Sequence, residues 1–362
     1  MATTTVTPDG RTLALGWPDG REGRFHAAWL RDSCPCPECR HPSGQRLLDS
    51  VAIPDDVALA SATAGNRAVD VVFTDGHEAS FDDGWLGEQV APPAPRPRRL
   101  WDAEIAQELP VERYEDVTAA GEALRRWLAA VDELGFGLLT GGPTEPGTVT
   151  RVAELFGYVR ETNYGRLFDV RSVIDATNLA YTGLGLGPHT DNPYRDPTPT
   201  LQLLHCLSSS AGGGENTLVD GFRVGEELRS SDPAAFEVLA RTPIRFRYSD
   251  GDTELEAERT VLELNERDEL RAIHFNTRSA VPPRLEPEAA AAFYSAYRTF
   301  GRLLGSAEHV LQFKLEPGDL FIVDNERVLH GRTGYSEAGE RHLQGCYADR
   351  DGLRSRLAVL SR

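Results

Sequence analysis

The sequence predicts a mainly β protein with flanking helices, in which a double-sheet jelly roll follows a small strand-rich N-terminal module. Three observations predict this fold class. From about residue 201, most segments are short strands separated by Gly, Pro and Asp turns. Helical patterns flank these strands, a combination that fits a jelly roll better than a parallel α/β sheet. A proline-rich stretch at residues 91–97 separates the first 90 residues from the rest.

Residues 1–90 form the predicted N-terminal domain. Within it, residues 69–73 and 79–81 are expected to be short strands around a turn at residues 74–76. The proline-rich stretch cannot pair as a central strand or continue a helix. Residues 91–99 are therefore predicted to be an interdomain linker, and residues 100–362 a single second domain.

The second domain is expected to contain three helices, because apolar residues recur at helical spacing in residues 118–134, 149–156 and 286–304. The aromatic residues of the last helix are expected to belong to the core. Residues 135–139 have the pattern of a short buried strand. Residues 311–315 and 320–323 flank a Glu-Pro-Gly-Asp turn and are predicted to pair as a β-hairpin.

Charge and hydropathy exclude several classes of partner. The chain has 362 residues and a formal net charge of −18, which disfavours nucleic acids and anionic membranes as partners. No apolar run reaches about 18 residues, so no membrane span is expected. The first residues lack a basic region followed by an apolar core, and the expected location is the cytoplasm.

A metal centre is predicted from His189, Asp191 and the distant His330. On an extended segment, residues two apart point to the same side, so His189 and Asp191 can reach one ion. Two imidazoles and one carboxylate form the facial triad of non-haem Fe(II) oxygenases, which leaves three coordination positions open. The alternative interpretation is two unrelated surface residues and a core histidine. We prefer the iron site, because both halves of the motif lie in strand-like surroundings.

Two of the open positions suit a 2-oxo acid, whose far carboxylate then needs a cation. Arg341 is the candidate, because a guanidinium matches a carboxylate with two parallel hydrogen bonds. Arg332 and Arg350 are nearby alternatives. Thr217, which follows a run of three glycines and two polar residues, is predicted to add a hydroxyl to the same carboxylate.

A second metal site is predicted in the N-terminal domain. Cys34, Cys36 and Cys39 lie too close together for a disulfide framework, and three thiolates supply most of a tetrahedral zinc site. The fourth ligand is open among His26, His41 and His77, of which His77 would tie two ends of the domain together. Such an ion would compensate for a small core. The alternative is a set of free buried cysteines. Seven Arg against fourteen Asp and Glu in residues 1–95 disfavour a nucleic-acid-binding finger.

Several sequence blocks resemble the γ-butyrobetaine and trimethyllysine dioxygenase group of 2-oxoglutarate oxygenases. The resemblance covers almost the whole chain and includes residues 29–36, 162–165, 178–182, 202–206, 219–222 and 341–349. It implies a zinc-binding N-terminal β domain, a double-stranded β-helix catalytic domain and a homodimer. It also implies iron on His189, Asp191 and His330, and zinc on three cysteines and His77. The 2-oxoglutarate would contact Arg341, with Thr217 and Leu204 beside it.

The resemblance further implies a substrate with a quaternary ammonium group, which has no N–H to donate and is recognised by aromatic rings. The matching residues are Tyr164, Phe168, Tyr181 and Tyr347. For each ring alone, ordinary core packing is the alternative.

Asn178 and Asn276 match positions that hold the substrate carboxylate in γ-butyrobetaine enzymes. Two residues depart from the animal enzymes: Phe168 stands in place of tryptophan, and Asn192, also in the expected substrate site, stands in place of tyrosine.

The expected reaction is hydroxylation of γ-butyrobetaine to L-carnitine, with Fe(II), O2 and 2-oxoglutarate and with ascorbate as a candidate reductant. Succinate and CO2 are the coproducts. The alternative substrates are trimethyllysine and 2-(trimethylammonio)ethylphosphonate. A more remote alternative is a non-catalytic betaine-binding module.

Overall fold

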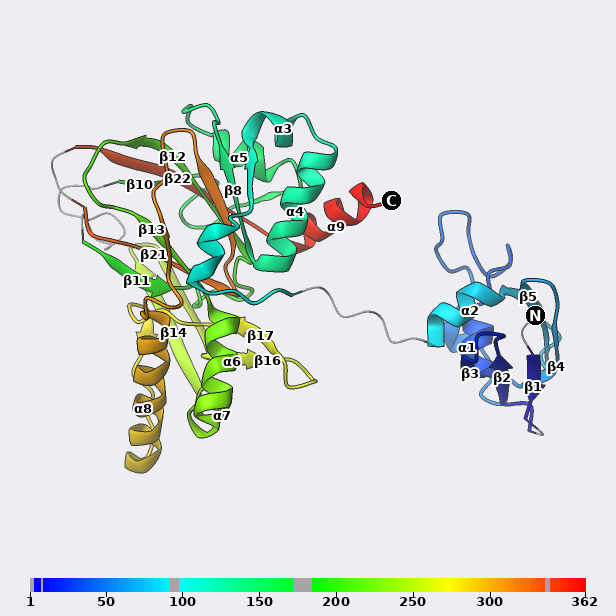
Figure 1. The fold of residues 1–362 in the computed structure, drawn as a ribbon. Coiled ribbons are helices and arrows are strands. Elements are labelled where there is room, and N and C mark those ends of the chain that lie inside the picture. Colours follow the sequence, from blue (N-terminus) through cyan, green and yellow to red (C-terminus); the bar gives the residue numbers. More distant parts are fainter. Residues whose placement is uncertain (1–2, 8, 91–97, 172–183, 336–338) are drawn as a thin grey trace. The chain divides into compact units, whose positions relative to one another are not determined.

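The protein folds into two compact units, residues 1–96 and 97–362 (Figure 1). The structure, a computed structural model, describes residues 3–7, 9–90, 98–171, 184–335 and 339–362. Most of the predicted linker, residues 91–97, lies outside the described residues, and each unit is described by itself. None of the helices in the described part of the chain combines the length and the apolar character that a bilayer crossing requires.

The N-terminal unit contains two three-stranded antiparallel sheets. The first comprises β1 (Thr3–Val6), β2 (Thr12–Gly16) and β3 (Glu22–His26), and the second comprises β4 (Leu59–Ala64), β5 (Ala68–Phe73) and β6 (Glu78–Asp82). Strands β5 and β6 agree with the predicted pair. Helix α1 (Ala27–Asp32), a 3-10 turn (Ser50–Ala52) and α2 (Asp83–Val90) complete the unit. Leu13, Leu30, Phe73 and Phe81 are fully buried between these elements.

Two facing sheets form the centre of the larger unit, as the predicted jelly roll requires. The seven-stranded sheet has the order β10 (Phe168–Val170), β22 (Arg341–Ala348), β12 (Leu201–Ser209), β20 (Leu320–Asp324), β8 (Phe136–Thr140) and β7 (Val111–Arg113), with β9 (Val159–Arg160) also on β22. The four-stranded sheet has the order β11 (Leu186–His189), β21 (Val328–Arg332), β13 (Asn216–Asp220) and β19 (Leu311–Phe313). Apolar side chains from both sheets meet in one core.

Three helices cover the outer face of the seven-stranded sheet: α4 (Glu122–Leu134), α5 (Thr148–Ala153) and α9 (Arg350–Leu360). The predicted helix from residue 118 is wrong at its start. The chain forms a separate turn of helix, α3 (Tyr114–Thr118), and then Ala120 and Gly121 adopt positive φ angles of 65° and 79°. A right-handed helix cannot pass through these angles. Helix α5 also ends three residues before the predicted limit.

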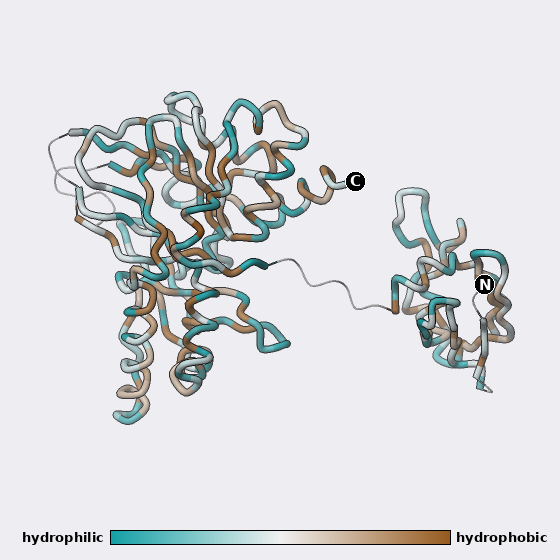
Figure 2. The backbone as a smooth tube through the Cα atoms, viewed as in Figure 1, coloured by the Kyte–Doolittle hydropathy of each residue, from teal (hydrophilic) through white to brown (hydrophobic). Residues whose placement is uncertain are grey.

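The segment between β13 and β19 adds a layer with its own core. It contains α6 (Gly221–Ser231), α7 (Pro233–Arg241), β14 (Pro243–Asp250), β15 (Thr253–Thr260), β16 (Leu262–Leu264), β17 (Leu270–Ile273), β18 (Ala280–Val281) and α8 (Pro287–Leu304). Phe293, Phe300 and Leu304 of α8 are buried, as predicted. Figure 2 shows brown, hydrophobic stretches along the inner strands of the larger unit. A 3-10 segment (Ala103–Gln107) packs near β19.

The predicted hairpin at residues 311–323 is wrong, because its two strands belong to different sheets. Strand β19 pairs with β13, whereas β20 pairs with β12 and β8. The turn between them carries the chain across the core, so that the rings of Phe313 and Phe321 meet edge to face at 5.8 Å. Residues of this turn bond to β12 instead of closing a hairpin: Cys206 N–H donates to Asp319 O and Gly318 N–H donates to Cys206 O.

Candidate metal centres and ligand cavity

The register between β11 and β21 brings two histidines together. His189 and His330 are cross-strand partners, with ring centroids 4.4 Å apart. Asp191 follows the end of β11, and its Oδ1 lies 3.5 Å from His189 Nε2 and 3.8 Å from His330 Nε2. All three ligand atoms therefore lie close enough together for one ion to contact them. The sequence-predicted triad forms one cluster in the structure.

Hydrogen bonds orient the members of this triad. His189 Nδ1 lies 2.9 Å from the carbonyl oxygen of Gly187, an arrangement that protonates Nδ1 and leaves Nε2 free to ligate. The Tyr347 hydroxyl donates to Asp191 Oδ2 at 2.8 Å, and the amide of Gln202 donates to the same oxygen. The other oxygen, Oδ1, faces the two imidazoles.

The protonation states suit a metal ligand set. Burial lowers the pKa of His330 to about 3, so its imidazole is neutral near pH 7. Desolvation raises the pKa of the Asp191 carboxyl, but the adjacent histidines and the Tyr347 hydroxyl lower it further, and the net shift is downward. Burial and the charge of Asp191 hold the pKa of Tyr347 well above its usual value, so this hydroxyl stays a donor. A neutral His330 imidazole beside the Asp191 carboxylate fits a divalent cation.

The loop that carries Asp191 is held from two sides. The Asn325 side chain accepts from Asp191 N–H at 2.7 Å and donates to Asp191 O at 2.9 Å. Asn276 Nδ2 donates to Thr190 O at 3.0 Å. Thr190 also exchanges hydrogen bonds with the backbone of Phe275. The following residue, Asn192, has a φ of 54°, a conformation that asparagine adopts more readily than most residues.

A cavity of about 620 Å³ opens between the two sheets beside this triad. Its volume lies within the range of ordinary ligand sites. Arg341 lines it, with Nε donating to Gly214 O at 3.2 Å and Nη2 donating to Asn216 Oδ1 at 3.0 Å. The third nitrogen, Nη1, is buried and has no hydrogen-bond partner among the described residues. A carboxylate would satisfy this donor, so the residues present fit the far end of 2-oxoglutarate.

Only some of the other residues predicted to contact this carboxylate line the cavity. Leu204 and Arg332 line the cavity, whereas Thr217 and Arg350 are not among the lining residues. Arg350 is instead paired with Asp324 at 2.6 Å and Glu326 at 2.7 Å. Thr217 is next to the lining residue Asn216 on β13, and its part in ligand binding stays a prediction. Asn216, which holds Arg341, was not identified from the sequence.

One wall of the cavity is aromatic. Phe168 and Tyr347 have ring centroids 5.1 Å apart, and Tyr164 lies 6.3 Å from Phe168. Two rings that the sequence did not identify extend this wall, because Tyr248 lies 5.8 Å from Tyr164 and 5.1 Å from Tyr194. The predicted residues Asn178 and Tyr181 lie outside the described residues.

Polar groups also line the cavity. Asn192 and Asn276, both predicted, line it together with Arg278 and Ser279, which were not predicted. Asn192 Oδ1 accepts from the Tyr194 hydroxyl at 2.6 Å. Asn276 Oδ1 accepts from Arg278 N–H at 3.1 Å, so its amide is already used on both sides and keeps one N–H to donate. Desolvation lowers the pKa of Arg278, and the carboxylate of Asp191 opposes this shift.

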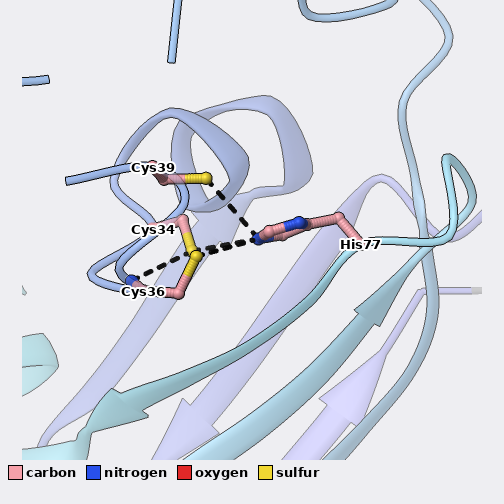
Figure 3. Close-up of side chains that lie close together, drawn as sticks. All are labelled: Cys34, Cys36, Cys39 and His77. Atoms are coloured by element: carbon pink, nitrogen blue, oxygen red, sulfur yellow. Dashed lines mark hydrogen bonds between the residues drawn. The ribbon is translucent and has the colours of Figure 1, made fainter. Parts of the chain in front are cut away.

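The cluster in the N-terminal unit has the geometry of a tetrahedral zinc site (Figure 3). The Sγ atoms of Cys34, Cys36 and Cys39 lie 3.2, 3.6 and 3.6 Å from His77 Nε2. Zinc–sulfur and zinc–nitrogen bonds of about 2.3 and 2.0–2.1 Å at tetrahedral angles would separate S and N by about 3.6 Å. The residues therefore fit zinc, with His77 as the fourth ligand. His26 instead caps α1, and His41 contacts Ser43.

Arg31 supports this cluster from the side. Its Nη1 lies 3.3 Å from Cys39 Sγ, and its Nε donates to Asp75 at 2.9 Å. Asp75 also accepts from His77 N–H at 3.0 Å, which fixes the turn that carries His77. Burial raises the pKa of Cys34 to about 12, so its thiolate requires a compensating cation.

Sequence patterns contained only part of this information. Gln202 could have been found from strand alternation, because it lies two residues before Leu204 and so faces the same side. Tyr194 and Tyr248 gave no such signal, since they lie far apart in the chain and their rings stack only in the folded protein.

Comparison with known proteins gives two family matches. The family described as Taurine catabolism dioxygenase TauD, TfdA family matches residues 93–347, and Gamma-butyrobetaine hydroxylase-like, N-terminal matches residues 4–86. A gamma-butyrobetaine dioxygenase of Pseudomonas sp. (strain AK-1) is 38% identical, with coverage of 97% of this chain and 94% of the relative. The mitochondrial trimethyllysine dioxygenase of Homo sapiens is 31% identical, with coverage of 93% and 83%. The crystal structure of the non-heme iron oxygenase OrfP with Fe, succinate and (3S)-hydroxy-L-Arg has a similar fold, with a TM-score of 0.50, 16% identity and coverage of 70% and 88%.

Proposed function

Because the chain belongs to the taurine catabolism dioxygenase TauD, TfdA family, we propose that it is an Fe(II)- and 2-oxoglutarate-dependent dioxygenase that hydroxylates γ-butyrobetaine to L-carnitine. One observation carries the proposal: a single cavity contains a metal-ligating triad, a buried arginine and a wall of aromatic rings. The similarity to a gamma-butyrobetaine dioxygenase over nearly the whole chain supports the choice of substrate.

The residues of the site have separate roles in binding iron and 2-oxoglutarate. Iron on His189, Asp191 and His330 would supply the oxidation of a C–H bond by O2, coupled to the conversion of 2-oxoglutarate into succinate and CO2. Arg341 binds the far carboxylate of 2-oxoglutarate, through a nitrogen that has no other partner in the described part of the chain. Leu204 contributes apolar surface to the lining of the same cavity, and such surface limits the access of water to the reacting groups.

The aromatic wall suits the trimethylammonium group of the substrate. A quaternary ammonium is held by the negative faces of rings, with about 0.5–2 kcal/mol for each contact. Tyr164, Phe168 and Tyr347 contribute rings to the wall, as do Tyr194 and Tyr248. Burial raises the pKa of the Tyr164 and Tyr194 hydroxyls, so neither phenol offers a negative charge of its own near pH 7. Recognition therefore depends on ring faces.

Trimethyllysine hydroxylation and non-catalytic betaine binding have less support. Trimethyllysine has a longer body with a second ammonium group, and the mitochondrial trimethyllysine dioxygenase is less similar to this chain than the gamma-butyrobetaine relative. A pure betaine-binding module would not need an intact triad beside a buried arginine. We also propose a homodimer, which the resemblance of the chain to this group supports; light scattering of the purified protein tests it.

The test is a reaction followed by NMR. Anaerobic protein loaded with Fe(II) receives 2-oxoglutarate, γ-butyrobetaine and then O2. Carnitine and succinate in equal amounts are expected. Succinate without carnitine would refute γ-butyrobetaine as the substrate and direct the search to other quaternary ammonium compounds. No succinate with any such compound, from folded and iron-loaded protein, would refute the oxygenase itself and favour a binding module.

A further inference from the structure

Three polar side chains on one part of the cavity wall have unused donors. Arg278 has no ion-pair or side-chain hydrogen-bond partner in the described ranges. Ser279 Oγ and Asn192 Nδ2 are both buried and likewise have no hydrogen-bond partner there. We propose that Arg278, Ser279 and Asn192 form a subsite for the oxyanion of the substrate, and that Arg278 selects substrates with an acidic end. This inference rests on the proposed function.

The subsite is held in place by Asn276. Its Oδ1 accepts from Arg278 N–H at 3.1 Å, and its backbone oxygen accepts from Ser279 N–H at 3.3 Å and Ala280 N–H at 3.1 Å. Ser279 O in turn accepts from Arg247 N–H at 2.8 Å, which attaches this turn to β14. Asn276 is thus a positioning residue for Arg278, in addition to any contact of its own with the substrate.

Charge distinguishes Arg278 from its neighbours. Arg247 lines the same cavity, but Glu254 already pairs with its guanidinium. Arg341 is occupied by Gly214 and Asn216 on two of its nitrogens, and its third nitrogen is assigned to 2-oxoglutarate. Arg332 also lines the cavity, but its Nε and Nη2 donate to Leu184 O at 3.3 Å. We therefore assign Arg278 as the cation that neutralises the acidic end of a substrate. A planar guanidinium binds either a carboxylate or a phosphonate through paired hydrogen bonds.

The arrangement also fixes the direction of the substrate. A trimethylammonium group is repelled by Arg278 and attracted by the ring faces around Phe168 and Tyr347. The acidic end is attracted by Arg278 and has no such attraction to the rings. A substrate with both groups should therefore bind with its ammonium against the rings and its acidic end on Arg278.

Binding under anaerobic conditions tests this subsite without turnover. Calorimetry measures the affinity of the Fe(II)- and 2-oxoglutarate-loaded protein for γ-butyrobetaine and for its carboxamide, in which a neutral amide replaces the carboxylate. For Arg278→Ala, a loss of at least about tenfold is expected for γ-butyrobetaine, because a charge-assisted hydrogen bond is removed. The carboxamide should change by less than about threefold. Arg278→Lys should recover part of the affinity. The matched control is Arg245→Ala on β14, which removes an exposed arginine that pairs with Glu256 and is not among the lining residues; its affinity should be close to that of the native protein.

The outcomes separate the two proposals. Equal losses for the acid and the carboxamide would refute the subsite, because Arg278 would then act only through the fold. Unchanged binding of γ-butyrobetaine to Arg278→Ala would also refute it. Binding of neither compound to the native protein would refute the proposed substrate class and the subsite with it. Tighter binding of 2-(trimethylammonio)ethylphosphonate than of γ-butyrobetaine, lost in Arg278→Ala, would support the subsite and reassign its preferred anion to a phosphonate.

Discussion

At the scale of single residues, Arg341 gives the most direct test of 2-oxoglutarate binding. A hydrogen bond to a charged group contributes roughly 1.5–3 kcal/mol. Arg341→Ala should therefore raise the KM for 2-oxoglutarate at least about tenfold. The KM for γ-butyrobetaine, measured at saturating 2-oxoglutarate, serves as the control and should change little. An unchanged KM for 2-oxoglutarate in this variant would remove Arg341 from the site.

His205 makes stability depend on pH. It is fully buried on β12, and burial lowers its pKa to about 4 from an ordinary value of 6.5. The unfolded chain therefore takes up a proton between these pH values when the folded chain does not. The contribution of His205 to the free energy of unfolding is present above the ordinary pKa and is lost as the pH falls from 6.5 toward 4. For this residue alone the loss between pH 7 and pH 5 is about 2 kcal/mol.

Urea unfolding at pH 7 and pH 5 measures this contribution. The native protein should lose more stability on acidification than His205→Leu, which cannot take up the proton. Identical pH dependence of the two proteins would mean that His205 is hydrated or protonated in the folded state.

At the scale of elements, a buried ion pair joins the end of β13 to the turn between β20 and β21. Arg327 Nη2 lies 2.8 Å from Asp220 Oδ2, and both side chains are almost fully buried. Asp220 also accepts from the N–H groups of Trp101 and Phe222. Removing one partner of such a pair leaves an unpaired buried charge and costs about 3–5 kcal/mol.

Asp220→Ala should therefore lower the free energy of unfolding by about that amount in chemical denaturation. Glu122→Ala is the matched control, because it breaks an exposed pair with Arg125 and should lower the free energy of unfolding far less. Similar effects of the two substitutions would show that the Asp220 pair is solvated in the folded protein.

Elements also show where prediction from the sequence succeeded and where it could not. The iron ligands were predictable, because His189 and Asp191 lie two residues apart in the sequence and such residues point to the same side of an extended segment. Strands β19 and β20 were not correctly paired, since a tight turn with apolar flanks looks the same whether it closes a hairpin or crosses between sheets. Arg278 was missed because an arginine is a candidate binding group only when no carboxylate of the protein pairs with it. The fold, and not the sequence, determines which residues form ion pairs.

At the scale of the whole molecule, the two units are expected to respond separately to loss of zinc. The N-terminal unit has a small core, so its stability should depend on the ion bound by Cys34, Cys36, Cys39 and His77. His77→Ala should abolish zinc binding and the calorimetric unfolding transition of residues 1–90. The transition of the larger unit should stay within a few degrees. His41→Ala, outside the cluster, is the control; loss of zinc in this variant instead would reassign the fourth ligand.

The single amide of Asn276 bonds to the backbone of the loop that bears Asp191 and to the backbone of Arg278. It therefore acts as a fixed spacer between the oxidising centre and the anchor of the acidic end. The position of the hydroxylated carbon would then be fixed by its distance from the acidic end of the substrate. In a homologue of γ-butyrobetaine longer by one methylene, the hydroxyl should appear at the same carbon counted from the acid, which NMR of the product would reveal. Hydroxylation at a constant distance from the ammonium would show that the aromatic wall fixes the position of the reacting carbon instead.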